Sequence, residues 1–480
     1  MKTILVSSVP EETRMAIVEG TELLAVEVER DSHSHLVGNI YKGQIQNVLP
    51  GMQAAFVDIG TGKNAFMYIG NGVAGDEANR VMPQEKIHIG QKLPVQITKD
   101  AIGSKGPRAT THLSLPGRNV VLMPNAPYIG ISRRIDNEAE RERLHQLARE
   151  LCPEGMGLIV RTVAVGKEKA ALEADVKYLT RLWESLKARN RLSVAPVQLY
   201  RDADLIIRIV RDYLTDDVER LIVDDSSVYR RVVELLDYIL PERTVRVELY
   251  EGHQPLFREY HIDEEMEKLG ERVIELSSGG SIVIDRTEAL TVIDVNTGKY
   301  IGHSNLAETV YRTNLEAAAE ILKQLRLRDI GGIIIVDFID MDTDDRKEEL
   351  LEYLRENVKY DRTKTNIVDI TSLGLVEITR KKSRQNYESI FYSECPCCHG
   401  RGTIESPETV AIRVSRAIRR MEAKSHSAFG YEVEVNPQVA EAENEDGILA
   451  ELARSLNITI KISAQPGLHP ESYSILQLGN

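Results

Sequence analysis

The fold is decided by three consecutive stretches of sequence. They read RTEALTVIDV (286–295), SNLAETVYRTNLEAAAEILKQLRLR (304–328) and GGIIIVDFID (331–340). The first and third are apolar runs of strand length, and the second has the length and periodicity of a helix. A strand, a crossover helix and a second strand predict a βαβ unit with parallel strands buried in a sheet. Asn305 and Glu308 fit a capping box at the start of this helix.

Each of the two strands carries an aspartate near its carboxyl end, Asp294 and Asp337. Open α/β sheets bind their ligands at this edge. Two adjacent carboxylates repel each other unless a cation or a shared proton compensates, and Mg²⁺ prefers such oxygen ligands. Asn296 follows on the same face as Asp294, where its amide would orient a metal-bound water or a phosphate oxygen. We favour a magnesium site over the alternative that these residues only cap the following helix.

Further aspartates follow the second strand, and we expect them to solvate a loop and to start the next helix: Asp340, Asp342, Asp344 and Asp345.

Several other regions of the chain have a recognisable pattern. Residues 1–35 predict an antiparallel meander that is too short to form a domain alone. Residues 204–275 are expected to alternate strand and helix, in the runs DLIIRIVRDYL, ERLIVDD and SSVYRRVVELLDYI, and are candidates for the missing partner of the meander. Five short strands in residues 36–115 predict a small closed barrel of the OB type. Residues after Cys398 predict one helix and short strands.

Composition excludes several classes of protein. The chain has 480 residues, which suggests about three domains, and its 42% apolar content excludes global disorder. A net charge of −14 excludes the class of strongly basic proteins that coat nucleic acids, although it allows a local basic patch. No apolar run approaches the ~20 residues of a membrane span, and the N-terminus has no signal-peptide core. Three of four cysteines crowd together, which is no disulfide framework and favours a reducing cytoplasm.

The segment CPCCHGRG at 395–402 contains a CxxC pair, Cys395 and Cys398, followed by two glycines. This pattern is typical of a zinc half-site, but a structural zinc needs four ligands. Either His399 and Cys397 complete the site, which is sterically poor, or a second chain supplies the same pair across a two-fold axis. The remaining alternative is a reduced or redox-active CxxC pair. We favour the shared zinc, with Cys397 as a bystander.

Two aromatic residues of the predicted barrel, Phe56 and Phe66, flank the turn at 60–63. If Ile59 pairs with Ala65, both lie on one face of the hairpin, where they would stack on single-stranded bases. The alternative is that both fill the barrel core. Two cations in a nearby loop would hold backbone phosphates: Lys105 and Arg108.

Basic residues elsewhere give weaker signals. Arg161 and Thr162 end the strand GLIVRT and combine a guanidinium fork with a hydroxyl, which suits a terminal phosphate. A solvated strand edge explains them equally well, and Arg133 and Arg134 are ambiguous in the same way. The basic run at 380–384 is either a solvated face or a track for a polyanion.

Three motifs in order closely resemble the ribonuclease E/G family of bacterial endoribonucleases: VIDVNTGKY (292–300), TNLEAAAEILKQLRLRDIGGIIIVDFIDM (313–341) and CPCCHGRG (395–402). The shorter motifs IYKG, AAFVDIG, VLMPN, ISRRI and EGMGLIVRT extend the resemblance towards the N-terminus, so that it covers residues 1–403. Without a long Arg- and Pro-rich tail, the chain resembles the ribonuclease G type more than full-length ribonuclease E.

The resemblance implies an α+β and α/β multidomain fold in which a split RNase H-like subdomain carries inserted regions. The implied parts are the first RNase H-like part (1–35), the OB-fold barrel (36–115), the 5′-phosphate sensor (116–203), the second RNase H-like part (204–275), the DNase I-like catalytic subdomain (276–392), the zinc link (393–403) and a small C-terminal domain (404–480).

The resemblance also assigns roles to residues. Asp294 and Asp337 would be the magnesium ligands, with Asn296 as their catalytic companion. Zinc would be bound by Cys395 and Cys398, the 5′-monophosphate by Arg161, Thr162 and Val121, and RNA by Phe56, Phe66 and Lys105. Leu373 stands where some members have an arginine near the active site. An RNA contact therefore either differs here or is made by Arg380 and its neighbours.

The implied function is Mg²⁺-dependent cleavage of single-stranded RNA that leaves 5′-phosphate ends and is stimulated by a substrate 5′-monophosphate. It would act in rRNA and tRNA processing and in mRNA decay. The expected assembly is a homodimer around a shared zinc, with pairing into tetramers left open. Two other classes compete: a non-catalytic single-stranded-RNA-binding protein, and a metal-dependent DNase or phosphodiesterase.

Overall fold

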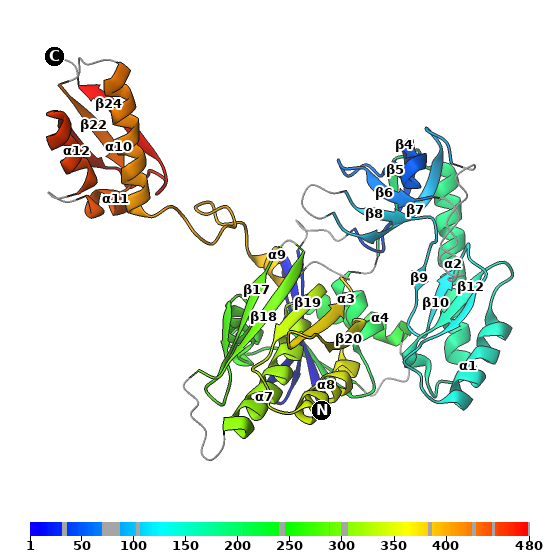
Figure 1. The fold of residues 1–480 in the computed structure, drawn as a ribbon. Coiled ribbons are helices and arrows are strands. Elements are labelled where there is room, and N and C mark those ends of the chain that lie inside the picture. The colour runs from blue at the N-terminus through cyan, green and yellow to red at the C-terminus, as the bar shows by residue number, and fades with distance from the viewer. Residues whose placement is uncertain are drawn as a thin grey trace. The chain divides into compact units, whose positions relative to one another are not determined.

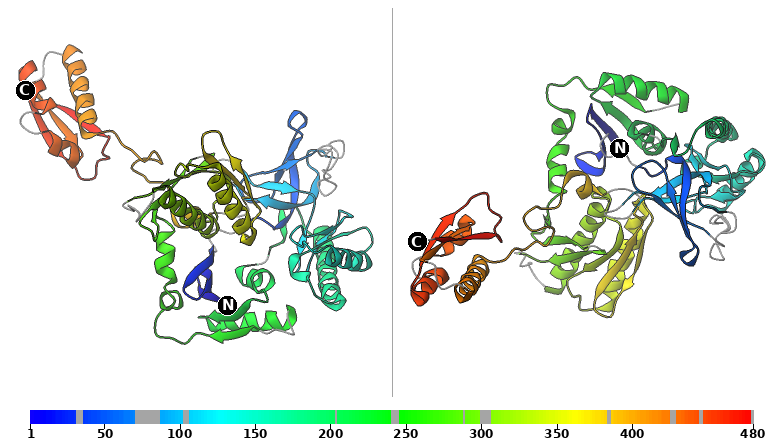
Figure 2. Two further views of the ribbon diagram at one scale, coloured as in Figure 1. Left: turned by 60° about the horizontal axis from the view of Figure 1, so that its bottom comes forward. Right: turned by 90° about the horizontal axis from the view of Figure 1, so that it is seen from above.

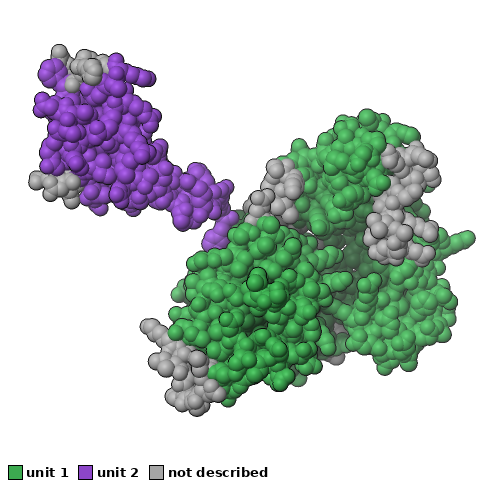
Figure 3. Space-filling view, in the orientation of Figure 1, with its two compact units in different colours: residues 1–390 green, residues 391–480 purple. Residues whose placement is uncertain are grey.

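The computed structural model describes residues 1–30, 36–69, 87–101, 106–202, 204–239, 245–287, 289–298, 306–382, 386–424, 429–443 and 447–478. These residues form two compact units, Met1–Ile390 and Phe391–Asn480 (Figure 3). Asn305, Lys105 and the C-terminal half of the 380–384 run lie outside the described residues. Among the described residues, no helix is both long enough and apolar enough to cross a membrane.

The N-terminal meander completes its sheet with strands from much later in the chain. The sheet has the order β15-β14-β1-β2-β3, built from β1 (Lys2–Val9), β2 (Glu12–Glu19), β3 (Glu22–Arg30), β14 (Val218–Val223) and β15 (Arg246–Leu249). β1 pairs antiparallel with β2 and parallel with β14, which confirms the predicted pairing with a distant segment. Figures 1 and 2 show the blue N-terminal strands beside green segments of this later region. The helices of this region are α4 (Ser226–Ile239), α5 (Leu256–Glu259) and α6 (Ile262–Lys268).

The alternation of strand and helix predicted for residues 204–275 is observed, and it begins with the helical residues 204–214. This segment forms the short helix α3 (Leu205–Arg208) and one π-helical turn, η6 (Ile209–Tyr213). The Asp204 side chain caps the helix by accepting a hydrogen bond from the Ile207 N–H. The buried residues of this segment have helical spacing and pack against the N-terminal sheet: Leu205, Ile206, Ile209, Val210 and Tyr213.

A closed five-stranded barrel follows, as predicted. Its strands are β4 (Ile40–Leu49), β5 (Ala54–Asp58), β6 (Ala65–Tyr68), β7 (Lys92–Lys99) and β8 (Arg108–Thr110), with a 3₁₀ turn, η2 (Pro50–Met52), after β4. The barrel closes because β4 pairs with both β5 and β7. A later strand, β13 (Val197–Tyr200), pairs with β4 and extends the same sheet. Small and medium side chains fill the interior: Ala55, Val57, Ala65, Met67 and Val95.

The next part of the first unit is a four-stranded sheet with two helices. It contains β9 (Leu115–Pro116), β10 (Val120–Met123), β11 (Ile129–Ile131), β12 (Gly157–Val160), α1 (Glu138–Leu151), α2 (Lys169–Leu192) and the 3₁₀ turn η5 (Thr162–Ala164). One face of α2 is an apolar stripe that is buried, with Leu172, Val176, Leu179 and Leu186 in the core and Trp183 packed at its margin.

The predicted βαβ unit lies at the centre of a six-stranded sheet. The strand order is β16 (Val273–Glu275), β17 (Ser281–Arg286), β18 (Leu290–Asn296), β19 (Gly332–Asp337), β21 (Leu375–Arg380), β20 (Thr365–Ile370). β18 and β19 are parallel, as expected, while the flanking pairs are antiparallel. The helices are α7 (Leu306–Leu327), α8 (Asp344–Asn357) with η7 (Val358–Tyr360), and α9 (Tyr387–Phe391), which crosses the boundary between the two units.

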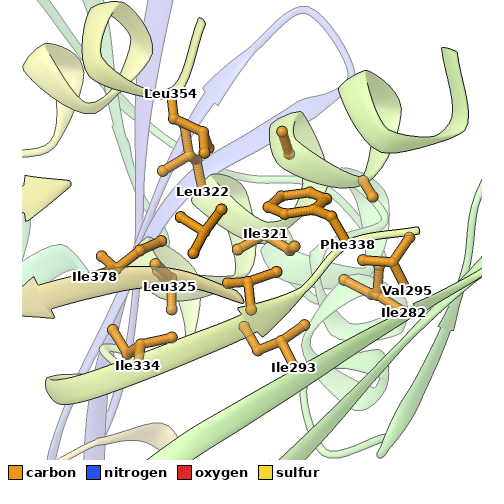
Figure 4. Close-up of a cluster of buried hydrophobic side chains, with 14 of the residues drawn as sticks. Ile282, Ile293, Val295, Ile321, Leu322, Leu325, Ile334, Phe338, Leu354 and Ile378 are labelled. Carbon is orange, nitrogen blue, oxygen red and sulfur yellow. The ribbon is translucent and has the colours of Figure 1, made fainter. Parts of the chain in front are cut away.

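Helices α7 and α8 pack on one face of this sheet. Their apolar residues form the core with alternate residues of the strands, including Ile293, Ile321, Ile334, Leu354 and Ile378 (Figure 4). The other face of the sheet is more open, since Ile333 on β19 is 52% exposed there.

The second unit is a three-stranded sheet with helices. β22 (Gly430–Val435) lies between β23 (Thr459–Ala464), which is parallel to it, and β24 (Tyr473–Leu478), which is antiparallel. The predicted helix is α10 (Pro407–Lys424), and two shorter helices were not predicted, α11 (Pro437–Ala442) and α12 (Ile448–Leu456). The core contains residues from helices and strands, such as Val414, Ile418, Val433 and Leu452.

Candidate active site and nucleic-acid contacts

Asp294 and Asp337 are brought side by side by the register of two parallel strands. Asp294 on β18 is the direct partner of Asp337 on β19. Side chains alternate along a strand, so the buried neighbours Ile293 and Val336 point towards the helices, while both aspartates lie on the open face and are exposed. The predicted juxtaposition of the two carboxylates is therefore observed.

Asn296 holds one of these carboxylates. It lies two positions after Asp294 on the same face, and its Nδ2 donates a hydrogen bond to Asp294 Oδ2 at 2.8 Å. This contact fixes the rotamer of Asp294, and it leaves the amide oxygen of Asn296 for a water or a phosphate group. The position agrees with the sequence prediction, while the amide N–H contact to Asp294 was not foreseen.

Two glycine-containing turns support the end of β18. Gly298 has φ +57°, and a Cβ atom there would lie 2.4 Å from the Gly279 carbonyl oxygen. A Cβ atom on Gly280 would lie 2.8 Å from the Asn296 carbonyl oxygen. Real Cβ atoms do not approach oxygen this closely, so both positions require glycine. The two turns thereby fix the backbone around Asn296.

The donor set suits Mg²⁺. Two carboxylates plus waters are a common protein contribution to a magnesium site, since this ion keeps several waters. Among the residues described, no cluster of three or more His, Cys, Asp or Glu side chains forms a metal cage, here or elsewhere. The pair Asp294 and Asp337 therefore fits Mg²⁺ and does not resemble a closed structural site.

The open sheet face suits a polymer better than a small molecule. A cavity of about 730 Å³ lies between β3, α7 and residues 361–363, and its lining residues do not include Asp294, Asn296 or Asp337. Small-molecule sites are usually concave and enclose most of the ligand. The aspartate pair instead lies on a surface where an extended chain has access.

The barrel carries an aromatic ladder on its outer face. Phe56 and Phe66 are direct cross-strand partners, with ring centroids 5.9 Å apart, so the predicted register was wrong by two residues but the shared face is correct. Both are half-buried while the alternate residues fill the interior, which excludes a core role. Tyr68 extends the ladder at 4.9 Å from Phe66 and is 46% exposed. Arg108 lies over the Tyr68 ring at 4.4 Å.

Arg161 and Thr162 follow β12 and lie at the end of the four-stranded sheet. Thr162 Oγ1 is 2.9 Å from the hydroxyl of Ser132. Arg161 Nη1 donates to the Gly117 carbonyl and forms an ion pair with Asp212, each at 2.7 Å. Val121 on β10 pairs with Ile159, so by strand alternation it lies on the same face as Arg161. The three residues predicted to bind a phosphate therefore lie together.

The CxxC segment in the second unit has the geometry of a metal-binding knuckle. The backbone N–H groups of Cys398 and Cys397 donate to the Cys395 sulfur, which lowers the pKa of this thiol. The His399 N–H donates to the Cys395 carbonyl at 2.8 Å, and His399 has φ +49°. His469 Nε2 lies 2.7 Å from the Cys397 carbonyl oxygen. A CxxC turn that favours the thiolate form offers two sulfur donors, so this donor set would fit half of a zinc site.

Comparison with known proteins decides the family. The model of the ribonuclease E/G family matches residues 114–383, and that of the RNase E/G thioredoxin-like domain matches residues 394–478. Ribonuclease G from Salmonella typhimurium (strain SL1344) and Ribonuclease G from Escherichia coli (strain K12) are each 40% identical over 99% of this chain and 99% of their own length. The chain belongs to the ribonuclease E/G family. It is therefore an enzyme of this family, as the resemblance implied.

A longer family member matches over part of its length. Ribonuclease E from Escherichia coli (strain K12) is 37% identical over 89% of this chain, which corresponds to 41% of that protein. In this ribonuclease E/G chain, the thioredoxin-like match covers the second unit almost completely. The names RNase H-like and DNase I-like for the sheets of the first unit remain predictions.

Arg380 is not available for RNA, contrary to one expectation. Its side chain is only 3% exposed and forms ion pairs with Asp361 at 2.7 Å and Asp329 at 2.5 Å. Leu373, which the resemblance places where some members have an arginine, is 80% exposed. The guanidinium is buried between two carboxylates, so Arg380 does not replace that arginine.

Sequence reasoning missed two residues of this ribonuclease E/G chain that contact the candidate sites, Tyr68 and Asp212. Tyr68 gave a signal, since it lies two positions after Phe66 on the same strand face. Asp212 gave none, because it is distant in sequence from Arg161. Lys105 lies outside the described residues.

Proposed function

We propose that this chain is a Mg²⁺-dependent endoribonuclease that cleaves single-stranded RNA and leaves 5′-phosphate ends. The observation that carries the proposal is the pairing of Asp294 with Asp337 on the open face of the six-stranded sheet. Family membership supports RNA as the substrate, and the names of the relatives support a role in RNA processing.

The reaction depends on charge and position. Asp294 and Asp337 would hold Mg²⁺, which supplies Lewis-acid stabilisation of the phosphate and a more acidic bound water. Asn296 would keep Asp294 in one orientation and present its amide oxygen to the attacking water. Because both aspartates lie on rigid strands, little reorganisation is needed when the substrate binds.

The preference for single strands would come from the barrel. Phe56, Phe66 and Tyr68 offer π faces to unstacked bases, and Arg108 offers a cation to the backbone. Lys105 is expected to contribute in the same way. A duplex cannot use such a ladder without unpairing its bases.

A substrate 5′-monophosphate would bind at Arg161, Thr162 and Val121. A guanidinium and a hydroxyl are suitable donors for a phosphate dianion. We further propose a homodimer that shares one zinc, with Cys395 and Cys398 from each chain as ligands, acting in the reducing cytoplasm that the cysteine pattern predicts.

The test is a cleavage assay on one RNA oligonucleotide with a 5′-monophosphate, a 5′-triphosphate or a 5′-hydroxyl, in the presence and absence of Mg²⁺. A DNA oligonucleotide of the same sequence is the matched control. We expect Mg²⁺-dependent internal cleavage of RNA that is fastest with the 5′-monophosphate. Cleavage of DNA at a similar rate, or RNA binding without cleavage, would contradict the proposal.

A further inference from the structure

The turn η6 of the N-terminal sheet region is bound tightly to the base of the four-stranded sheet. Arg118, only 5% exposed, donates from Nη1 to the Val210 carbonyl at 2.9 Å and from Nη2 to the Leu214 carbonyl at 2.7 Å. Arg211 Nη1 donates to the Pro116 carbonyl at 3.3 Å. These contacts hold the backbone of η6 beside residues 116–119.

Asp212 lies in the middle of this turn and contacts Arg161. Its Oδ1 atom is 2.7 Å from Arg161 Nη1, and the same nitrogen also donates to the Gly117 carbonyl at 2.7 Å. Both hydrogens of Nη1 are therefore used. The other carboxylate oxygen of Asp212 accepts from Arg211 Nη2 at 2.9 Å.

Asp212 remains charged in this buried position. Burial raises the pKa of Asp212, but the neighbouring guanidinium groups of Arg211 and Arg161 outweigh burial, and the net direction is downward. An ionised carboxylate is a strong acceptor for the Arg161 N–H group. The contact is therefore a fixed anchor for the guanidinium at neutral pH.

The anchor uses only one nitrogen of Arg161. Within the described part of the chain, the Nε and Nη2 atoms of Arg161 have no hydrogen-bond partner. These two N–H groups lie on one edge of the planar guanidinium and point in parallel, which is the arrangement that binds two oxygens of a phosphate. The side chain of Arg161 as a whole is 27% exposed, so it is partly accessible to solvent.

We propose that Asp212 is a positioning residue for substrate recognition: it fixes Arg161 through Nη1, so that the Nε–Nη2 edge is presented to the 5′-phosphate of the RNA. The inference deepens the proposed function and rests on it. Asp212 itself does not touch the phosphate. By fixing the Arg161 side chain before RNA binds, Asp212 reduces the conformational entropy that this side chain would lose on binding.

The role of Asp212 can be tested by shortening its side chain. The contacts that hold η6 in place use backbone carbonyl groups, as for Arg118, and Arg362 Nη1 likewise donates to the Asp212 carbonyl oxygen at 3.2 Å. Arg362 also lies over the Tyr213 ring at 4.3 Å. These contacts do not depend on the Asp212 side chain, so η6 is expected to stay in place when that side chain is shortened.

The experiment compares Asp212→Ala, Asp212→Asn and Arg161→Ala in the full chain. For each, kcat and KM are measured on one RNA with a 5′-monophosphate and with a 5′-hydroxyl. We expect Asp212→Ala to reduce the advantage of the monophosphate by about 10-fold, mainly through KM, because a charge-assisted contact is lost. Asp212→Asn should keep part of the advantage, since its amide oxygen still accepts from Nη1.

The Arg161→Ala variant separates this inference from the proposed function. If Arg161→Ala keeps the advantage of the monophosphate, the proposed phosphate site itself is wrong. If Arg161→Ala loses the advantage of the 5′-monophosphate while Asp212→Ala keeps or increases this advantage, Asp212 does not position Arg161. Equal losses on both RNAs in Asp212→Asn would assign Asp212 to folding and overturn the inference. Asp216→Ala, an exposed carboxylate nearby, is the matched control.

Discussion

Asp294 and Asp337 occupy the same register position on adjacent parallel strands, although a long helix separates them in sequence. The pair is held by the backbone hydrogen bonds of the sheet and by the core beneath it. Catalytic groups on strands are placed more accurately than groups on loops. The helices that cover the opposite face thus stabilise the site without obstructing it.

Replacing either aspartate should abolish cleavage. Asp294→Asn and Asp337→Asn each remove an anionic ligand while keeping the side-chain volume, and we expect cleavage to fall by about 100-fold or more. Both side chains are exposed, so thermal unfolding should not change. Asp285→Asn is the matched control, because Asp285 is an exposed carboxylate of the same sheet that pairs with Arg272. Near-normal turnover of either variant at saturating Mg²⁺ would exclude the metal site.

Gly298→Ala should impair catalysis through the backbone. The new methyl group would meet the Gly279 carbonyl and displace the turn after Asn296. We expect a large loss of cleavage with RNA binding retained. Gly20→Ala is the control: Gly20 has a similar positive φ, but no atom lies within 4 Å of the added Cβ. It should cost only about 1 kcal/mol of stability. Equal activity of the two variants would contradict the proposed close contact.

The aromatic ladder should contribute to RNA affinity in steps. Phe66→Ala and Tyr68→Ala are each expected to weaken binding of single-stranded RNA by about 1–3 kcal/mol, the value typical of base stacking. Binding is measured by fluorescence anisotropy in the Asp294→Asn background, which prevents cleavage. Ile89→Ala removes an exposed apolar side chain from a turn of the barrel and should have little effect. An effect limited to Phe66 would show that the ladder ends there.

The zinc proposal predicts both a stoichiometry and an assembly state. Metal analysis should find about half a zinc per chain, because each chain supplies two of four ligands. Cys395→Ser combined with Cys398→Ser should release the zinc and convert dimers into monomers in analytical ultracentrifugation. Cys397→Ser should do neither. One full zinc per chain would instead indicate a site closed within one protomer.

Arg380→Met should destabilise the six-stranded sheet in a pH-dependent way. Burial raises the pKa of Asp361, but the hydrogen bond and charge of Arg380 lower it below its usual value of 3.8. The ion pair therefore contributes stability above about pH 4, and this contribution is lost as the pH falls further. Loss of one partner of a buried pair costs about 3–5 kcal/mol at pH 7.

Urea unfolding of Arg380→Met and the parent protein at pH 7 and near pH 3 measures this effect. The difference between the two proteins should shrink at the lower pH. Arg272→Met, which removes an exposed partner of Asp285, should have little effect at either pH. A pH-independent difference would mean that Arg380 acts through packing alone.

The sequence predicted the catalytic sheet because its signals are local. Hydrophobic runs and helical periodicity identify β18, α7 and β19, and the βαβ rule then places Asp294 beside Asp337. The local signal is less decisive in residues 204–214, where β-branched residues at helical spacing form α3 and η6. There, packing against the N-terminal sheet outweighs the intrinsic strand preference.

The remaining errors concern contacts between distant segments. Arg380 belongs to a basic run that resembles a solvated face, but its partners Asp329 and Asp361 come from two other segments. The cation over Tyr68 depends on the parallel pairing of β6 with β8, and the anchor of Arg161 depends on the turn η6. No local pattern contains this information, so only the tertiary structure reveals it.

The N-terminal sheet takes its strands from two distant parts of the sequence, and this affects how the chain folds during synthesis. The meander β1–β3 leaves the ribosome first, but β14, the parallel neighbour of β1, follows only after the barrel and the four-stranded sheet have been made. At about 5–20 residues per second, β1 waits on the order of ten seconds or more for this partner. During that time one of its edges is unpaired and open to wrong strand pairing. Slowed translation between residues 30 and 218 should therefore increase aggregation, while the barrel, whose five strands are nearly contiguous, should be less affected.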